Sequence, residues 1–392
     1  MHDSPRAAVK RILGTMRLEV DPVRLKDLRT RIGMPLEDAA DKAKVDAIQL
    51  ASWEKRSEPL EIEALRRLAK VYNRNWYVFL LEDEVGDPAL PHDFRRLRSQ
   101  QRKITAPTLI AFDNAGFLLQ KINGLPRPED SPQKLAAIRG ADAEAAAKRI
   151  RNQLGASLDE QRRFGDEYAT LRYWSKLLAG AGVYTAQMSF PYKEVRAFCL
   201  RQNGTQVIVV SSQDYPRARV FSMLHELAHV LLGSTAMCRP RPDDGGHSDE
   251  EAYCNAFAAA MLMPVHEFRN DPDVVAFRGR DVELTDLRPL GRKYGASALA
   301  TARRLATVGM VSDETYLRLQ SESDDAFSSD SSGGTGLRIR SQPARMINEN
   351  SRLYATEVLD AHARGDITFR DIGVLLDGNL KHVEKVREEL AK

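Results

Sequence analysis

The spacing of apolar residues divides the chain into parts with different predicted structures. Between 23 and 81, and again between 343 and 392, apolar residues recur every three or four positions, which predicts short amphipathic helices. Between 182 and 212 they fall in short alternating or β-branched runs, which predict the strands of a small sheet. We therefore expect an α+β fold that is mostly helical.

Two longer helices are predicted after these strands. The first begins at Pro216 and ends at Gly233, the usual positions of these two residues at helix ends. A loop rich in Pro, Gly and Asp follows. The second helix then begins after Ser248, a suitable N-cap, and ends at Pro264.

Composition and charge narrow the function classes. The chain has 392 residues, 43% hydrophobic and 29% charged, as in globular proteins of two or three domains. Lys plus Arg number 58 and Asp plus Glu 55, so the net charge of +3 is too balanced for a dedicated nucleic-acid coat. With three cysteines, no signal-like apolar stretch in residues 1–20 and no apolar run near the ~18 residues that cross a bilayer, we expect a cytoplasmic protein outside the membrane.

The sequence HELAH at 225–229 carries the strongest chemical signal. Two histidines four residues apart, His225 and His229, lie on one face of an α-helix, where both imidazoles reach one Zn²⁺. Glu226 then stands near the water that the metal acidifies, as the general base of peptide hydrolysis. The sequence therefore predicts one zinc ion per chain, with Mn²⁺ as the alternative metal.

A catalytic zinc needs a third protein ligand and one open position for water. The second long helix supplies Glu250 and Glu251 as candidates. Asn255 follows Glu251 one turn later on the same face, where its amide would orient a ligand histidine. We select Glu251 as the ligand and Asn255 as the orienting residue.

Further side chains compete for the metal. His247 and Cys238 lie in the loop between the two helices, and Cys254 follows Glu251 on roughly the same face. Loop histidines and buried cysteines are mostly structural. A Cys254 thiolate in the position of the water would instead make the enzyme latent. The oxyanion stabiliser stays open among Tyr253, His247, His266 and Arg217.

With these motifs the chain resembles the ImmA/IrrE family of metallopeptidases over about residues 20–310. The resemblance rests on RVFSMLHELAHVLLG and EEAYCNAFAAAMLMP, on the predicted strands before them and on the segment PHDFRRLR. It implies a gluzincin-like core with a small sheet and an HExxH helix, with the metal ligands and the catalytic glutamate at the positions given above. The family often has alanine where this chain has Cys254.

The segment from 25 to 72 is similar to an XRE-type helix-turn-helix domain, with its recognition helix at about 46–54. A DNA-reading helix presents Arg, Lys, Asn or Gln to base edges. Residues 36–54 instead contain five acids, and the recognition helix offers little beyond Gln49 and Ser52. The family also commonly has glutamine where this chain has Leu36. We expect protein docking or a vestigial role rather than operator reading.

The resemblance implies a substrate and a signal. The substrate is a helix-turn-helix transcriptional repressor, whose cleavage derepresses stress, DNA-damage, mobile-element or antiviral genes. The signal is single-stranded DNA, whose phosphates a local basic cluster would bind. This cluster consists of Arg95, Arg96, Arg98, Arg102 and Lys103. An ordinary solvated surface is the alternative for the cluster.

A second hypothesis exists for the whole chain. It is a transcription regulator that binds an operator through its first domain and uses the peptidase-like domain as a sensor. The acidic recognition helix argues against it, and so does Glu226, which a pure binding module has no need to keep.

Five segments are expected along the chain, and the change from acidic 82–88 to basic 93–103 marks the first boundary. They are an XRE-like helix-turn-helix domain at 1–88, a zinc metallopeptidase domain at 89–275, a helical unit that completes the core at 276–320, a flexible linker rich in Ser and Gly at 321–340, and a C-terminal helical domain at 341–392. The role of the last segment and the oligomeric state stay open.

Overall fold

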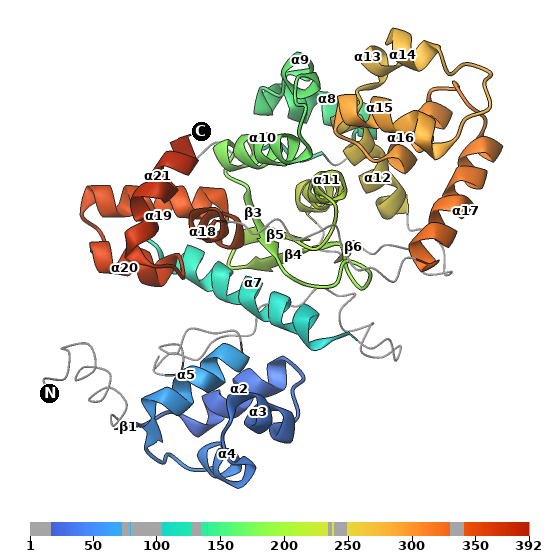
Figure 1. Cartoon of the computed structure of the whole chain (residues 1–392). Helices are drawn as coiled ribbons and strands as arrows, with labels where there is room; N and C mark the ends of the chain where they lie inside the picture. The colour runs from blue at the N-terminus through green and yellow to red at the C-terminus, as the bar shows by residue number, and fades with distance from the viewer. Residues whose placement is uncertain are drawn as a thin grey trace, which may run out of the picture. The chain divides into compact units, whose positions relative to one another are not determined.

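Contacts divide the chain into two units, which we describe separately (Figure 1). The computed structural model describes residues 17–72, Phe79, 104–126, 135–138, 140–233, 237–238, 249–329 and 341–391. Unit 1 comprises the described residues up to Phe117, and unit 2 comprises those from Leu118 onward. Helix α7 (Ala106–Gly124) contributes its first part to unit 1 and its last part to unit 2.

Short amphipathic helices make up most of unit 1, at the positions that the apolar pattern predicts. They are α2 (Pro22–Arg31), α3 (Leu36–Ala43), α4 (Ala47–Trp53) and α5 (Ile62–Val71). The carboxylates of Asp21 and Asp46 accept hydrogen bonds from the first-turn N–H groups of α2 and α4, which fixes where these helices begin. The buried faces of these helices form one core, which includes Leu28, Leu50 and Leu65. Residues of α7 pack against this core. Strands β1 (Arg17–Leu18) and β2 (Leu60–Glu61) pair antiparallel beside them.

A buried ion pair connects two of these helices. The Arg29 guanidinium of α2 donates to both carboxylate oxygens of Glu54, just after α4, over 2.6 and 2.7 Å. A further nitrogen of Arg29 donates to the Met34 carbonyl over 2.7 Å. The side chains are only 11% and 4% exposed, so this pair fixes the position of α4 from inside the unit.

A mixed four-stranded sheet with the order β3-β5-β4-β6 lies at the centre of unit 2. Strands β3 (Tyr184–Met188) and β5 (Thr205–Ser211) are parallel, and β4 (Ala197–Gln202) runs antiparallel to β5. The short β6 (Met237–Cys238) pairs with the start of β4. These are the strands that the short alternating or β-branched runs predict, with β6 added.

Helices surround this sheet. Before it come α8 (Ala143–Leu154), α9 (Leu158–Arg162) and α10 (Glu167–Gly180), and after it α11 (Pro216–Leu232), α12 (Asp249–Leu262), α13 (Val265–Arg269), α14 (Pro272–Val275), α15 (Leu284–Tyr294), α16 (Ala298–Thr307) and α17 (Asp313–Ser329). Helix α11 packs on β4 and β5 and is flanked by α10 and α12 (Figure 1). The two long helices that carry the predicted metal ligands are therefore neighbours.

The C-terminal helices cover the free edge of the sheet at β3. They are α18 (Gln342–Asn350), α19 (Arg352–Arg364), α20 (Phe369–Leu375) and α21 (Val383–Ala391), with the 3-10 turn η2 (Leu380–His382) before the last. The Thr185 backbone N–H donates to the Ser351 hydroxyl over 3.2 Å, and the Tyr184 hydroxyl donates to the Glu357 carboxylate over 2.8 Å. The C-terminal helices thus cover the edge strand β3, which would otherwise expose unpaired backbone groups.

Two sequence expectations change in unit 2. Residues 321–329, expected to begin the flexible linker, continue α17, because a helix propagates more easily than it nucleates and no glycine interrupts this one before Gly333. Residues 330–340 of that linker lie outside the described residues. Helix α18 adds a helix to the predicted C-terminal helical domain, whose periodicity is clear only from Ser351 onward, because α18 has nine residues with a proline near the start and gives a weak periodic signal.

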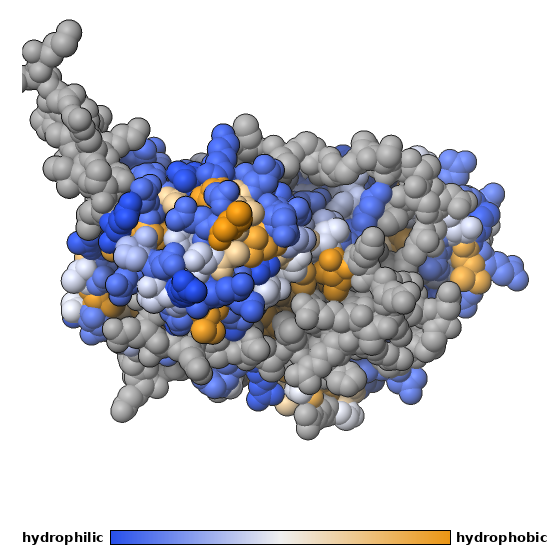
Figure 2. Space-filling view, turned by 90° about the horizontal axis from the view of Figure 1, so that it is seen from below, coloured by the Kyte–Doolittle hydropathy of each residue, from blue (hydrophilic) through white to orange (hydrophobic). Residues whose placement is uncertain are grey.

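Hydrophilic residues dominate the described part of the face in Figure 2, where apolar residues form small spots. The large apolar side chains that are most exposed among the described residues are Ile48 at 83%, Val23 at 73% and Leu317 at 60%. In the described part of the chain, we found no helix with the length and apolar content needed to span a bilayer.

Candidate metal centre

Helix α11 forms as the sequence predicts and is buried on almost all sides. Pro216 stands in its first turn, and Gly233 ends it with a φ of 78°, in the left-handed region that favours glycine. Between the sheet and its helical neighbours, the side chains of His225, Glu226 and His229 are at most 1% exposed. Burying three titratable groups is costly unless they pair with one another or with a cation.

The two histidines and Glu251 bring their ligand atoms together. The Nε2 atoms of His225 and His229 are 3.2 Å apart. The Glu251 carboxylate approaches the first with Oε2 at 3.3 Å and the second with Oε1 at 3.2 Å. Among the described residues, these three form the group of His, Cys, Asp or Glu side chains whose ligand atoms could hold one metal ion.

These separations fit a tetrahedral metal ion. Ligand bonds of about 2.0–2.1 Å at tetrahedral angles place neighbouring ligand atoms roughly 3.3–3.4 Å apart. The separation of the two Nε2 atoms, 3.2 Å, is close to this value, and each nitrogen has a different oxygen of the Glu251 carboxylate at 3.2 to 3.3 Å. Two nitrogens and one carboxylate oxygen are also the donor set of hydrolytic zinc sites, which keep a fourth position open.

The outer nitrogens of both imidazoles are hydrogen-bonded as well. His225 Nδ1 lies 3.0 Å from the amide oxygen of Asn255, and His229 Nδ1 lies 3.0 Å from Oε1 of Glu250. When Nδ1 donates to an oxygen, a neutral imidazole carries its lone pair on Nε2, the form that binds metals. Asn255 therefore stands where the sequence places it, and Glu250, the other candidate for third ligand, contacts the opposite side of the His229 ring.

The electrostatics of the site favour a positive charge between its carboxylates. Burial lowers the pKa of His229, but hydrogen bonds to Cys254 and Glu251 and the charge of Glu226 outweigh it and raise the pKa well above its usual value. Burial raises the pKa of Glu251, but hydrogen bonds from both histidines outweigh it and lower the pKa. A metal ion would take the place of the proton that these groups share.

Glu226 lies beside the histidines on the sheet side of the helix. Its side chain is fully buried, and its charge acts on His229 and also on the Cys199 thiol of β4. Burial, together with this charge, raises the pKa of Cys199 above its usual range, so that thiol stays protonated. Glu226 is therefore a buried acid close enough to act electrostatically on His229, and its role at the metal stays a prediction.

The competing ligands lie in different places. The buried Cys254 thiol hydrogen-bonds the His229 imidazole but is not among the three converging ligands. Burial raises its pKa, while His229 lowers it. Cys238 belongs to β6 through its backbone pairing with Ala197. His247 lies outside the described residues.

The remaining candidates are separated from this group. Arg217 pairs with Glu167 of α10 over 2.8 Å, and His266 is exposed on α13. Burial raises the pKa of Tyr253, with smaller effects from Cys254, Asp142 and Arg149, and Tyr253 is not among the three converging ligands. The basic cluster of Arg95, Arg96, Arg98, Arg102 and Lys103 lies outside the described residues, so its role as a nucleic-acid contact stays a prediction.

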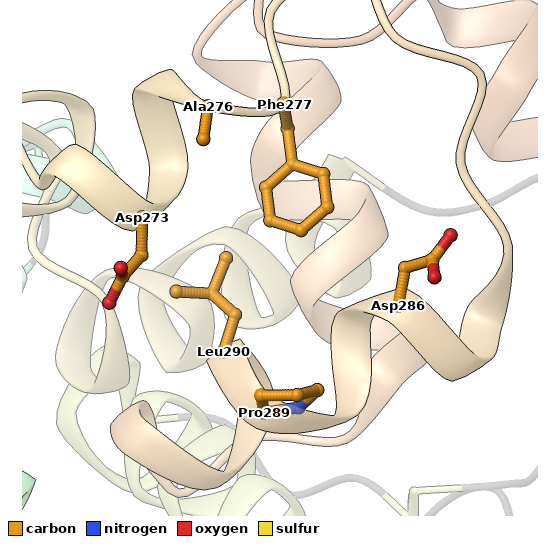
Figure 3. A pocket seen from close by; sticks show the side chains of 6 residues that line it. All are labelled: Asp273, Ala276, Phe277, Asp286, Pro289 and Leu290. Carbon is orange, nitrogen blue, oxygen red and sulfur yellow. The ribbon is translucent and has the colours of Figure 1, made fainter.

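A cavity of about 300 Å³ opens elsewhere in unit 2, between α14 and α15 (Figure 3). It is lined by Asp273, Ala276, Phe277, Asp286, Pro289 and Leu290. Both carboxylates on its wall have partners, because Asp273 pairs with Lys293 over 2.6 Å and Asp286 accepts the backbone N–H of Glu283. The cavity contains none of the predicted site residues.

Comparison with known protein families gives a match to part of the chain. Residues 179–306 match the family model of peptidase M78, the IrrE N-terminal-like domain, a segment that begins just before β3 and ends within α16. No curated protein and no solved structure shows significant similarity to the chain. The match makes this part of the chain similar to a peptidase domain and supports a metallopeptidase role, and the convergent histidines and glutamate are compatible with it.

Proposed function

We propose that the chain is a zinc-dependent, site-specific endopeptidase that cleaves a helix-turn-helix transcriptional repressor. The match to the IrrE N-terminal-like domain is the premise. The observation that carries the metal chemistry is the convergence of His225, His229 and Glu251, whose nitrogen and oxygen atoms approach one another to 3.2 to 3.3 Å. The repressor substrate, and the derepression of stress, DNA-damage or anti-phage genes, follow from the family resemblance.

Each site residue has a role in this proposal. His225, His229 and Glu251 would hold the ion, which when bound supplies Lewis-acid polarisation of a peptide carbonyl and acidifies water. Glu226 accepts the proton of the attacking water and delivers it to the leaving amine.

Activation by single-stranded DNA is a further part of the proposal. The basic cluster at 95–103 carries it, because phosphates are attracted by local positive charge even when the net charge of the chain is only +3. Unit 1 would serve for docking of the repressor or for signal input. Exposed acids on α3, such as Glu37 and Asp38, are unfavourable against a phosphate backbone.

The test is a cleavage assay with the full chain. Purified protein with measured zinc content is incubated with helix-turn-helix repressors encoded near its own gene, with excess zinc, with and without single-stranded DNA. Glu226→Gln is the matched control, since it keeps the size of the side chain and removes its ability to take a proton. We expect one cut, located by mass spectrometry, with wild type and a rate at least about 10²–10⁴-fold lower with Glu226→Gln.

Two results would contradict the proposal. One is a wild-type chain that binds no metal at micromolar zinc. The other is equal cleavage by wild type and Glu226→Gln, which would identify a contaminating protease. Tight binding of an operator by the full chain, without any repressor cleavage, would instead support the transcription-regulator hypothesis.

A further inference from the structure

The two predicted ligand histidines differ in what holds their outer nitrogens. His225 faces a neutral amide, since its Nδ1 lies 3.0 Å from Asn255 Oδ1. His229 faces a carboxylate, since its Nδ1 lies 3.0 Å from Glu250 Oε1. A carboxylate only accepts hydrogen bonds, whereas an amide can turn and offer its NH₂ group instead. The contact to Glu250 therefore determines the tautomer of His229 more strictly than Asn255 determines that of His225.

Neighbouring residues of one helix reach opposite edges of the His229 ring. Glu250 and Glu251 stand in the first turn of α12, about 100° apart around its axis. Glu251 reaches Nε2 of His229 at 3.2 Å, and Glu250 reaches Nδ1 of the same ring at 3.0 Å. The imidazole is thus held between two carboxylates, one on the metal side and one behind it.

We propose that Glu250 is a positioning residue of the metal centre, which holds His229 in the tautomer and orientation that point its Nε2 lone pair at the metal. A carboxylate behind a ligand histidine fixes the ring and increases its strength as a ligand. The inference rests on the proposed metallopeptidase function, but it concerns metal binding and can be tested without a substrate.

Because the side chains of His229 and Glu250 differ in exposure, Glu250 can be substituted without disturbing the core. The His229 side chain is 1% exposed, whereas that of Glu250 is 45% exposed. Shortening Glu250 therefore leaves no cavity in the core, and the variant should fold like the wild type. Water that replaces the carboxylate can donate as well as accept a hydrogen bond, so it would not enforce one tautomer.

The chain offers a matched control at the preceding position. Asp249 is also an exposed acid in the first turn of α12, so Asp249→Ala removes the same charge from the same helix end. Glu250→Gln keeps an oxygen that can accept from Nδ1 while it removes the charge. Together these variants separate the hydrogen bond from the general electrostatic effect of an acidic residue.

The experiment measures zinc affinity of the full chain by competition with a chromophoric chelator. We expect Glu250→Ala to weaken zinc binding about 10–100-fold, Glu250→Gln to recover most of this loss, and Asp249→Ala to stay within about 2-fold of wild type. The cobalt-substituted protein gives a second measurement, because the visible absorption of bound Co²⁺ should change with Glu250→Ala and not with Asp249→Ala. Thermal unfolding without metal should be alike for all variants.

Two outcomes would overturn the inference. Equal losses with Asp249→Ala and Glu250→Ala would mean that only the local negative charge matters. Wild-type zinc affinity and an unchanged cobalt spectrum in Glu250→Ala would mean that the contact does not position the ligand. Absence of repressor cleavage by the wild type would contradict the proposed function but not this inference, since zinc binding is measured separately.

Discussion

Both units bury charged side chains, but they arrange them differently. In unit 1, Arg29 and Glu54 form a self-sufficient pair in which each carboxylate oxygen accepts a hydrogen bond and a further guanidinium nitrogen donates to a carbonyl. In unit 2, the Nε2 atoms of two histidines face each other at 3.2 Å, an arrangement that two neutral imidazoles with protons on Nδ1 would not favour.

This difference distinguishes buried charges that stabilise the fold from buried groups that can bind a ligand. A pair that satisfies itself stabilises the fold and leaves no donor atom available to a ligand. In unit 2 the ligand atoms of the histidines and Glu251 lie 3.2 to 3.3 Å from one another. Such atoms need a proton or a metal ion between them. The partners of a buried charged side chain therefore indicate its function better than its burial does.

The largest expected effect tests the chemical side of this comparison. Glu251→Ala should weaken zinc binding on the order of 10³-fold or more, because two imidazoles remain where a zinc site takes at least three protein ligands. The measurement is zinc content after gel filtration, together with the affinity from chelator competition. If Glu251→Ala bound zinc as well as the wild type, Glu251 would not be the third ligand, and the contrast between the two units would not hold.

A somewhat smaller effect tests the structural side. Glu54→Ala leaves the buried Arg29 without its carboxylate, so we expect a loss of about 3 kcal/mol in the free energy of unfolding of unit 1. Glu63→Ala is the control, since it removes an exposed pair with Arg66 and should cost less than about 1 kcal/mol. Hydrogen exchange of α2 and α4 in increasing urea reports the stability of unit 1. Equal losses in both variants, or loss of zinc binding in Glu54→Ala, would contradict the assignment.

The pH dependence of stability distinguishes Asp271, a carboxylate of unit 2 with hydrogen-bonding partners that stabilise the fold, from the carboxylates of the predicted metal site. Burial raises the pKa of Asp271, but hydrogen bonds from Lys293 and Tyr294 outweigh it and lower the pKa below the usual value. Since the folded pKa lies below the unfolded one, Asp271 stabilises the fold above about pH 4, and this contribution is lost as the pH falls through the folded pKa. Urea midpoints between pH 7 and 3 should therefore converge for wild type and Asp271→Asn. A difference that is constant over this range would contradict the prediction.

The smallest effect concerns the surface of unit 1. Ile48 of α4 is 83% exposed, so Ile48→Ser should change the free energy of unfolding by less than about 0.5 kcal/mol and leave zinc affinity unchanged. The same urea and chelator measurements apply. A loss above about 1 kcal/mol would contradict the exposed position of this side chain.

Local sequence signals predicted the elements of both units better than the partners of their side chains. Helix α11 follows from Pro216, Gly233 and the spacing of its apolar residues, which act within one or two turns. Strands β3, β4 and β5 follow from their short alternating or β-branched runs. The two-residue strand β6 carries no comparable signal, because it depends on backbone pairing with β4.

The third ligand illustrates the limit of local reasoning. Glu250 and Glu251 are both acids in the first turn of a helix, and the sequence favoured Glu251 only through its spacing to Asn255. Which one faces the metal depends on how α12 is rotated against α11. The buried stripe of α12, to which Cys254, Phe257, Ala258 and Met261 belong, sets that rotation. It also brings the Cys254 thiol to His229, in agreement with the short distance that the sequence suggested.

The sequence by itself determined that two histidines and a glutamate share one helix turn, because the period of an α-helix is fixed by its own backbone hydrogen bonds. The sequence also suggested Glu251 and Asn255 as partners of the histidines, but only the tertiary structure brings Glu251 to their inner nitrogens and places Asn255 and Glu250 at their outer ones. Those contacts join residues more than twenty positions apart. They depend on packing of apolar faces across the whole core, which no local pattern encodes.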